Sequence, residues 1–122
     1  MLCHAIALSE YKKYISGKYT VIVAETECQK RQGLRRVHYL ARDTFIIFPN
    51  IGSNVFFNTV DCFIPLDIVS LDKNNVILNI RTVSPGHSYI GPTPSGTERV
   101  LETTAGYFKY NNWNIGDKLL FL

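Results

Sequence analysis

Four side chains in this sequence can offer acid–base or ligand-binding chemistry: Asp61, Asp67, His87 and Glu102. Two carboxylates that lie close together raise the pKa of one of them, and a carboxyl group with a raised pKa can act as a general acid or base. The sequence leaves open whether Asp61 and Asp67 meet. A small hydrolase-like enzyme that uses these four groups is therefore one hypothesis.

Each of these groups also has a structural interpretation. Asp67 begins an apolar segment, where a short carboxylate commonly accepts hydrogen bonds from local backbone amides. Glu102 lies in another apolar segment, and a buried glutamate requires a partner. Three arginines can supply that partner in an ion pair, namely Arg36, Arg81 and Arg99. The sequence favours these structural roles over catalysis.

The other residues that catalysis commonly uses occur here without their usual motifs. His87 has no second histidine at zinc-binding spacing, so the sequence predicts no metal and no cofactor. The GxSxG motif of many serine hydrolases is absent. Cys62 is expected to be a small buried thiol in the core. No catalytic residue is therefore predicted.

A cluster of basic residues is the clearest electrostatic feature of the chain. It can contact phosphates or an acidic protein surface, or it can be a solvated helix end that interacts favourably with the helix dipole. The pI of 8.8 lies below the value of about 9 that dedicated nucleic-acid-binding domains commonly exceed. The sequence thus argues against nucleic acid as a partner. The cluster comprises Lys30, Arg31, Arg35, Arg36, His38 and Arg42.

The composition indicates one β-rich domain that spans residues 1–122. A chain of 122 residues fits a single domain with one core. Apolar residues make up 46% and charged residues 19%, which excludes a disordered chain. Seven tyrosines and seven phenylalanines favour strands over helices.

The cysteines and the N-terminal segment predict a cytoplasmic protein. Cys3, Cys28 and Cys62 are an odd number without a CxxC pair, which is typical of reduced thiols inside a cell. The N-terminus has no basic region ahead of its short apolar run, so it makes a poor signal peptide. No stretch approaches the ~18 apolar residues that span a bilayer, so we expect no membrane partner.

Local patterns predict the following elements. TECQ at 26–29 is a capping box, the pattern that begins a helix: the side chain of Thr26 accepts a hydrogen bond from the backbone amide of Gln29, and the side chain of Gln29 accepts one from the backbone amide of Thr26. Gly33 can end the helix that follows. The DKNN turn joins two strands into a hairpin. We expect helices over 9–16 and 27–32, strands over 19–24, 44–48, 54–57, 67–71, 76–82, 98–103 and 118–122, and a long Pro/Gly-rich loop over 84–97.

Four motifs carry a resemblance to a known family. They are AETECQKRQGL at 24–34, Pro65-Leu66-Asp67-Ile68, Val100-Leu101-Glu102 followed by Ala105-Gly106, and Ile115-Gly116-Asp117. In these motifs and their order, residues 19–122 resemble the family catalogued as domain of unknown function 192, and residues 1–18 lie outside the resemblance. It implies a small barrel-like β fold, with a Gly-Asp turn similar to that of cradle-loop barrels, and no established activity.

Several positions depart from the family's pattern. Arg35 stands where the family usually has Met. Ahead of the Pro-Leu-Asp motif, the family's Trp-Met and Asn-Thr positions hold Asn58, Thr59, Asp61 and Cys62. A ligand shared by the family should therefore not be assumed for this chain.

The leading hypothesis is a non-catalytic binding or protein-interaction domain, whose working surface is the 84–97 loop and the 57–67 segment. The expected partner is a small polar ligand or a protein, and the oligomeric state stays open. Besides the small enzyme, the alternative is a structural accessory protein of a larger, phage-type assembly. The candidate binding residues are Asn58, Asp61, Asp67, His87, Tyr89, Glu102 and Arg36.

Overall fold

Two strands that are buried along their whole length form the middle of the β-sheet. They are β3 (Thr44–Phe48) and β4 (Leu66–Leu71), and β6 (Arg99–Thr104) lies between them. The computed structural model describes residues 2–122, so only Met1 of the expected 1–122 domain lies outside it. Strands that are apolar on both faces require cover on both faces. The rest of the chain supplies that cover.

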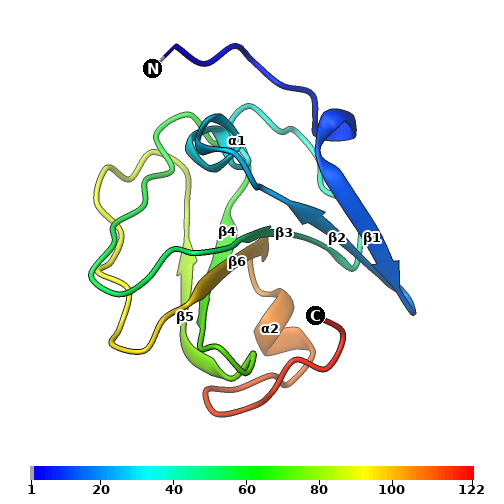
Figure 1. The fold of residues 1–122 in the computed structure, drawn as a ribbon, viewed down its shortest axis with the longest axis vertical. Coiled ribbons are helices and arrows are strands. Elements are labelled where there is room, and N and C mark those ends of the chain that lie inside the picture. Colours follow the sequence, from blue (N-terminus) through cyan, green and yellow to red (C-terminus); the bar gives the residue numbers. More distant parts are fainter. Residues whose placement is uncertain (1) are drawn as a thin grey trace.

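The sheet has six strands in the order β1-β2-β3-β6-β4-β5 (Figure 1). Strands β2 and β3 are parallel, and the other neighbours are antiparallel. Because β1 and β5 are both edge strands, the sheet does not close. The mainly β fold with short helices is confirmed, and "barrel-like" describes it only loosely. The remaining elements are β1 (Lys12–Ser16), β2 (Tyr19–Val23), β5 (Ile77–Val83), α1 (Glu27–Gln32), α2 (Tyr107–Tyr110) and a 3-10 turn, η1 (Leu8–Glu10).

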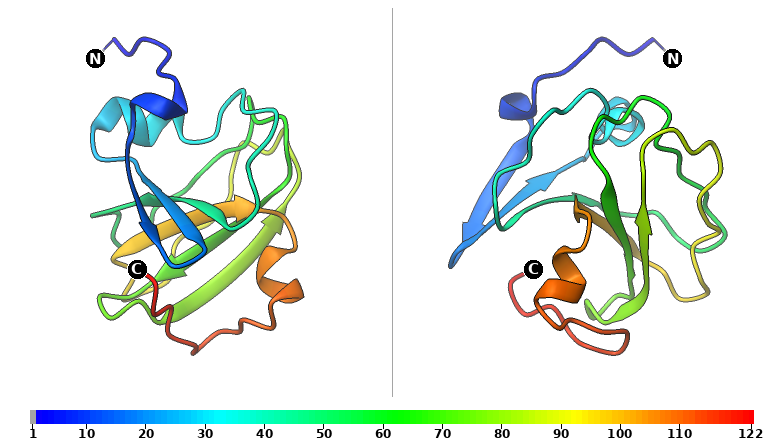
Figure 2. Two further views of the ribbon diagram at one scale, coloured as in Figure 1. Left: turned by 90° about the vertical axis from the view of Figure 1, so that its right-hand side faces the viewer. Right: turned by 180° about the vertical axis from the view of Figure 1, so that it is seen from behind.

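Each face of the sheet carries its own hydrophobic core. Figure 2 shows α1 and the N-terminal segment on one side of the sheet and α2 with the C-terminal segment on the other. The first core packs Leu34, just past α1, against Ile46 and Phe48. The second packs Phe108 of α2 against Phe45 and other strand residues. Side chains alternate between the two faces along each strand, so consecutive residues of β3 serve different cores.

The capping box of α1 forms as the sequence predicts. The hydroxyl of Thr26 accepts a hydrogen bond from the amide of Gln29 at 3.1 Å, and the Gln29 side chain accepts one from the amide of Thr26 at 3.2 Å. Gly33 ends the helix with φ 50°, a left-handed value that favours glycine. The helix therefore has the expected bounds, and the chain turns sharply at its C-terminal end.

The helix expected over 9–16 is wrong, because most of that segment is strand β1. Gly17 and Lys18 form a two-residue turn, and Ser16 pairs with Tyr19 in an antiparallel hairpin with β2. Gly17 has φ 60°, as such tight hairpin turns require. Gly17, which directly follows the expected helix, therefore lies in a hairpin turn.

Two expected strands are also wrong. Of the 54–57 segment, only Phe57 forms a bridge, with Ile90. Of the 118–122 segment, only Lys118 forms one, with Val76. Phe121 packs its ring against Tyr19 at 4.2 Å between centroids, so the chain's end contributes to the second core rather than to the sheet.

A disulfide joins Cys3 to Cys28, with 5.3 Å between their Cα atoms. The expectation of three reduced thiols is therefore wrong for these two, because the N-terminal segment folds back along α1 and brings Cys3 to the helix. Cys62 is a free, buried thiol, as expected. Within residues 2–122, no helix has the length and apolar character to cross a membrane.

Candidate functional site

Two segments about 30 residues apart in sequence lie side by side and form one surface, which we call the loop ribbon (residues 54–61 and 84–93). Phe57 and Ile90 exchange backbone hydrogen bonds of 2.8 and 2.9 Å. The amide of Thr59 donates to the carbonyl of His87 at 2.8 Å, and its hydroxyl donates to the carbonyl of Ser84 at 2.9 Å. The two segments expected to form the working surface are thus brought together.

Aromatic and polar side chains project from this ribbon. The rings of Phe56 and Tyr89 meet edge to face at 5.2 Å, and these side chains are 47% and 80% exposed. The imidazole Nε2 of His87 lies 3.2 Å from the hydroxyl of Ser84. A hollow of about 380 Å³ lies beside them, lined by Arg81, Thr82, Val83, His87, Tyr89, Ile90 and Gly91. This surface can hold a planar or polar group.

A second group of candidate residues gathers at the C-terminal end of α1. The guanidinium of Arg35 donates to Asp61 Oδ2 and to Asn58 Oδ1, both at 3.4 Å. The amide of Arg36 donates to the carbonyl of Asp61 at 2.9 Å, and Arg36 adopts φ 62°. Three of the predicted residues, Arg36, Asn58 and Asp61, therefore share one location. Arg35 joins them there.

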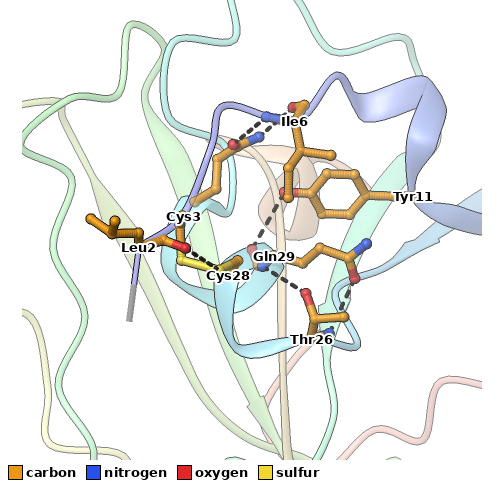
Figure 3. Close-up of a disulfide and its surroundings, with 8 residues drawn as sticks. Leu2, Cys3, Ile6, Tyr11, Thr26, Cys28 and Gln29 are labelled. Atoms are coloured by element: carbon orange, nitrogen blue, oxygen red, sulfur yellow. Dashed lines mark hydrogen bonds between the residues drawn. A yellow bond between two sulfur atoms is a disulfide. The ribbon is translucent and has the colours of Figure 1, made fainter.

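These residues border a groove of about 560 Å³ that runs between α1 and the N-terminal strap, which we define as residues 3–8. The strap forms one wall. Arg31 and Gln32 of α1, the turn residues Arg35 and Arg36, and Asp61 supply polar groups on the other walls. Figure 3 shows how the disulfide and the hydrogen bonds at Ile6 hold the strap over α1.

Glu102 lies in the first core without the predicted ion pair. Its side chain is only 6% exposed, and no residue within 2–122 donates a hydrogen bond to it or forms an ion pair with it. The expected pairing with Arg36, Arg81 or Arg99 is wrong, because this face of the sheet is packed with apolar side chains. Burial raises the pKa of Glu102 to about 8, so the group is mostly protonated at neutral pH.

Cys62 lies near this carboxyl group and is a poor nucleophile. The pKa of its thiol is raised to about 11, mainly by burial and also by the negative charges of Glu102 and Asp61, while the positive charge of Arg35 acts in the opposite direction. A thiol becomes reactive when its pKa is lowered, and here it is raised. The expectation of a buried core thiol is confirmed.

Asp67 has a structural role, in which its buried carboxylate accepts three hydrogen bonds. Its Oδ1 accepts hydrogen bonds from the hydroxyl of Thr82 at 2.6 Å and from the amide of Gly106 at 2.9 Å. Its Oδ2 accepts one from the amide of Phe108 at 3.0 Å. Asp67 therefore ties β4 to β5 and to the start of α2. Since Glu102 pairs with Ile68, the neighbour of Asp67, the two carboxyl groups lie on opposite faces of the sheet.

The four groups of the hydrolase hypothesis are thus dispersed. Asp61 pairs with Arg35, Asp67 caps backbone amides, His87 contacts Ser84, and Glu102 is buried alone. No two of them are within hydrogen-bonding distance. Within residues 2–122, there is also no group of three or more potential metal ligands.

The candidate binding residues predicted from the sequence do not include Arg35 and Phe56, which belong to the two surfaces. Arg35 carried a signal, since it belongs to the basic cluster and replaces an apolar residue of the family. Phe56 carried none, because the FF pair at 56–57 gives no indication of which ring is exposed. The ribbon that exposes Phe56 depends on pairing with residues far along the chain.

The fold defines a small domain built on one open, six-stranded sheet with a short helix on each face. Its family follows from a sequence model that matches residues 10–121. The chain belongs to the family of domain of unknown function 192, described as "Uncharacterized ACR". That match begins ahead of the four motifs, which start at residue 24.

Two crystal structures share this fold. One, from Sinorhizobium meliloti 1021, bears the description "putative transcription regulator"; it has a TM-score of 0.78 and 24% identity, over 88% of this chain and 92% of that chain. The other, a protein of unknown function from Novosphingobium aromaticivorans DSM 12444, has a TM-score of 0.74 and 23% identity, over 84% and 79%. At these identities the likeness shows the fold alone. No curated protein matches the sequence.

Proposed function

We propose that this chain is a non-catalytic binding domain and that the loop ribbon is its working surface. The observation that carries the proposal is the joining of residues 54–61 and 84–93 into one surface with an exposed aromatic pair, Phe56 and Tyr89, next to a hollow. Amphipathic aromatic groups beside polar ones are typical of ligand and protein contacts. The ligand class expected is a small polar molecule or a protein segment.

The dispersal of the carboxylates supports binding rather than turnover. A general acid or base must reach the reacting group, and a second group commonly assists it. Asp67 is only 1% exposed and accepts three hydrogen bonds, and Asp61 is paired with Arg35 rather than with a second acid or base. His87 and Tyr89 are the ribbon residues best placed to contact a ligand, by hydrogen bonding and by ring packing respectively.

Nucleic acid fits this surface poorly. The ribbon's hollow has one arginine, Arg81, and the net charge of the chain is only +3. Phosphate contacts by several cations supply most of the affinity for nucleic acid. We therefore do not extend to this chain the description that the Sinorhizobium meliloti protein carries.

Thermal unfolding in the presence of a panel of small polar molecules and peptides tests the proposal. A ligand at a hundred times its Kd stabilises the folded state by about 2.7 kcal/mol, which raises Tm measurably. We expect Tyr89→Ala to abolish the shift caused by a ligand of the ribbon. The matched control is Tyr110→Ala, because Tyr110 is 87% exposed but belongs to α2.

Two results would count against the proposal. A shift that survives Tyr89→Ala and Phe56→Ala would place the binding surface elsewhere. Chemical conversion of a bound ligand, detected by chromatography after incubation with the protein, would overturn the non-catalytic assignment.

A further inference from the structure

We propose that the groove under the N-terminal strap is a second binding site, which takes a small oxyanion with about two negative charges, such as a phosphate or a dicarboxylate. This site adjoins the loop ribbon at Asp61, but its three arginines lie outside the ribbon. Three arginines, Arg31, Arg35 and Arg36, line the groove, together with a single carboxylate, Asp61. Three positive charges and one negative charge leave an excess of two positive charges.

The arginines are available to a ligand. Within residues 2–122 there are two ion pairs, Lys12 with Glu25 and Arg35 with Asp61. Arg31 and Arg36 therefore have no acidic partner there. The contact of Arg35 with Asp61 spans 3.4 Å between half-exposed side chains, and such pairs contribute about 0–1 kcal/mol. An incoming oxyanion can displace it and accept two parallel hydrogen bonds from the planar guanidinium.

The attraction must come from these side chains and not from the helix. The groove lies at the C-terminal end of α1, where the helix dipole is weakly negative. Lys30 and Arg31 in the last turn of α1 complement that dipole and outweigh it. Because the site depends on side-chain cations alone, we expect that removing one of them strongly reduces the affinity for the oxyanion.

The strap holds the groove in shape before a ligand arrives. It is anchored to α1 at two points, at Cys3 by the disulfide to Cys28 and at Ile6 by the side chain of Gln32 (Figure 3). The amide of Ile6 donates to Gln32 Oε1 at 2.8 Å, and Gln32 Nε2 donates to the carbonyl of Ile6 at 2.5 Å. Further along, the buried Tyr11 donates its hydroxyl to the carbonyl of Gln29 at 3.4 Å. A wall fixed in advance lowers the entropy that binding must overcome.

The disulfide also makes the site sensitive to reduction. A dithiol such as dithiothreitol transfers two electrons and two protons to the Cys3–Cys28 bond, giving two thiols and one cyclic disulfide of the reagent. The strap then keeps only its hydrogen bonds to α1. Reduction should therefore weaken binding of the anion, because one wall of the groove loses its covalent anchor.

Isothermal titration with inorganic phosphate and with malonate tests the proposal, and the comparison distinguishes phosphate from carboxylate recognition. We expect the double variant Arg31→Gln/Arg36→Gln to lose at least tenfold in affinity for the preferred anion. The control is Lys73→Gln/Lys109→Gln, which removes the same charge from the turn between β4 and β5 and from α2, away from α1 (Figure 1). This control should retain affinity within about twofold.

The strap has its own test. The variant Cys3→Ser/Cys28→Ser, or treatment with dithiothreitol, should lower the affinity for the anion about three- to tenfold. Circular dichroism should show that the fold is retained. Unchanged affinity after either treatment would overturn the strap as a wall of the site. Equal losses in the arginine and lysine variants, or no heat with either anion, would overturn the site itself.

The outcomes for the groove and for the loop ribbon are separable. Tyr89→Ala should leave the affinity for the anion unchanged, because Tyr89 does not line the groove. Conversely, the arginine variant should keep any thermal shift caused by a ligand of the ribbon. The two proposals are therefore tested by separate measurements, and the failure of one does not overturn the other.

Discussion

Glu102 presents an unusual case at the scale of a single residue, because its side chain is buried and none of residues 2–122 donates a hydrogen bond to its carboxyl group. In the unfolded chain it has an ordinary pKa near 4.5, and in the folded chain its pKa is about 8. Between these values the folded state binds more protons than the unfolded state, so the free energy of unfolding falls as pH rises. The contribution is fully present below pH 4.5 and is lost as pH rises through 8.

Glu102→Gln should remove this dependence. Glutamine is neutral at every pH and matches the shape of the protonated acid, so the variant should unfold with similar free energy to the native chain at pH 5. At pH 9 it should be more stable by a few kcal/mol, since each unit of pKa shift corresponds to about 1.4 kcal/mol. Urea unfolding at several pH values provides the measurement. Parallel pH profiles for the two proteins would show that Glu102 is ionised in the folded state.

At the scale of elements, α2 depends on a residue some 40 positions before it in the chain. The helix has only four residues and begins after Gly106, whose φ is 84°. Its first amides have no local side-chain cap, and the carboxylate of Asp67 in β4 takes that place. Phe108, the buried residue of this helix, fills the second core. Asp67 thus joins the sheet to the element that covers one of its faces.

Asp67→Ala should consequently destabilise the fold strongly. It leaves the buried amide of Phe108, the amide of Gly106 and the hydroxyl of Thr82 without their acceptor, which costs roughly 3–5 kcal/mol. The control is Asp117→Ala, where an exposed carboxylate accepts one backbone bond from Asn114 and the expected loss is below about 1 kcal/mol. Chemical denaturation of both variants gives the comparison. Equal losses would remove the special role assigned to Asp67.

These elements also show which parts of the fold could be predicted from the sequence. The capping box of α1, the buried strands β3 and β4 and the β4–β5 hairpin follow local rules, and local patterns predicted them. Strand β1 and helix α2 depend on partners elsewhere, so no local pattern indicated them. The same holds for the candidate sites. The 84–97 loop was expected from its composition, whereas its pairing with residues 54–61 and the folding of the strap onto α1 depend on contacts between distant segments.

At the scale of the whole molecule, the disulfide bears on where the protein works. The sequence suggested a cytoplasmic protein with reduced thiols, but Cys3 and Cys28 are joined in the structure. Reducing systems of the cytosol normally keep such thiols reduced, and an oxidising compartment preserves the bond. The strap would therefore stay covalently closed in an oxidising compartment, and the reducing systems of the cytosol would be expected to open the disulfide.

The redox state of Cys3 and Cys28 in the native protein distinguishes an oxidising compartment from the reducing cytosol. If the chain works in an oxidising compartment, acid quenching followed by alkylation with a mass-tagged maleimide should label one thiol, Cys62, and only after denaturation because it is buried. Mass spectrometry counts the tags. Three tags would mean that the Cys3–Cys28 bond is reduced in the native setting, and the anion site would then have the weaker affinity expected after reduction. The Cys3→Ser/Cys28→Ser variant provides the reference for a single labelled thiol.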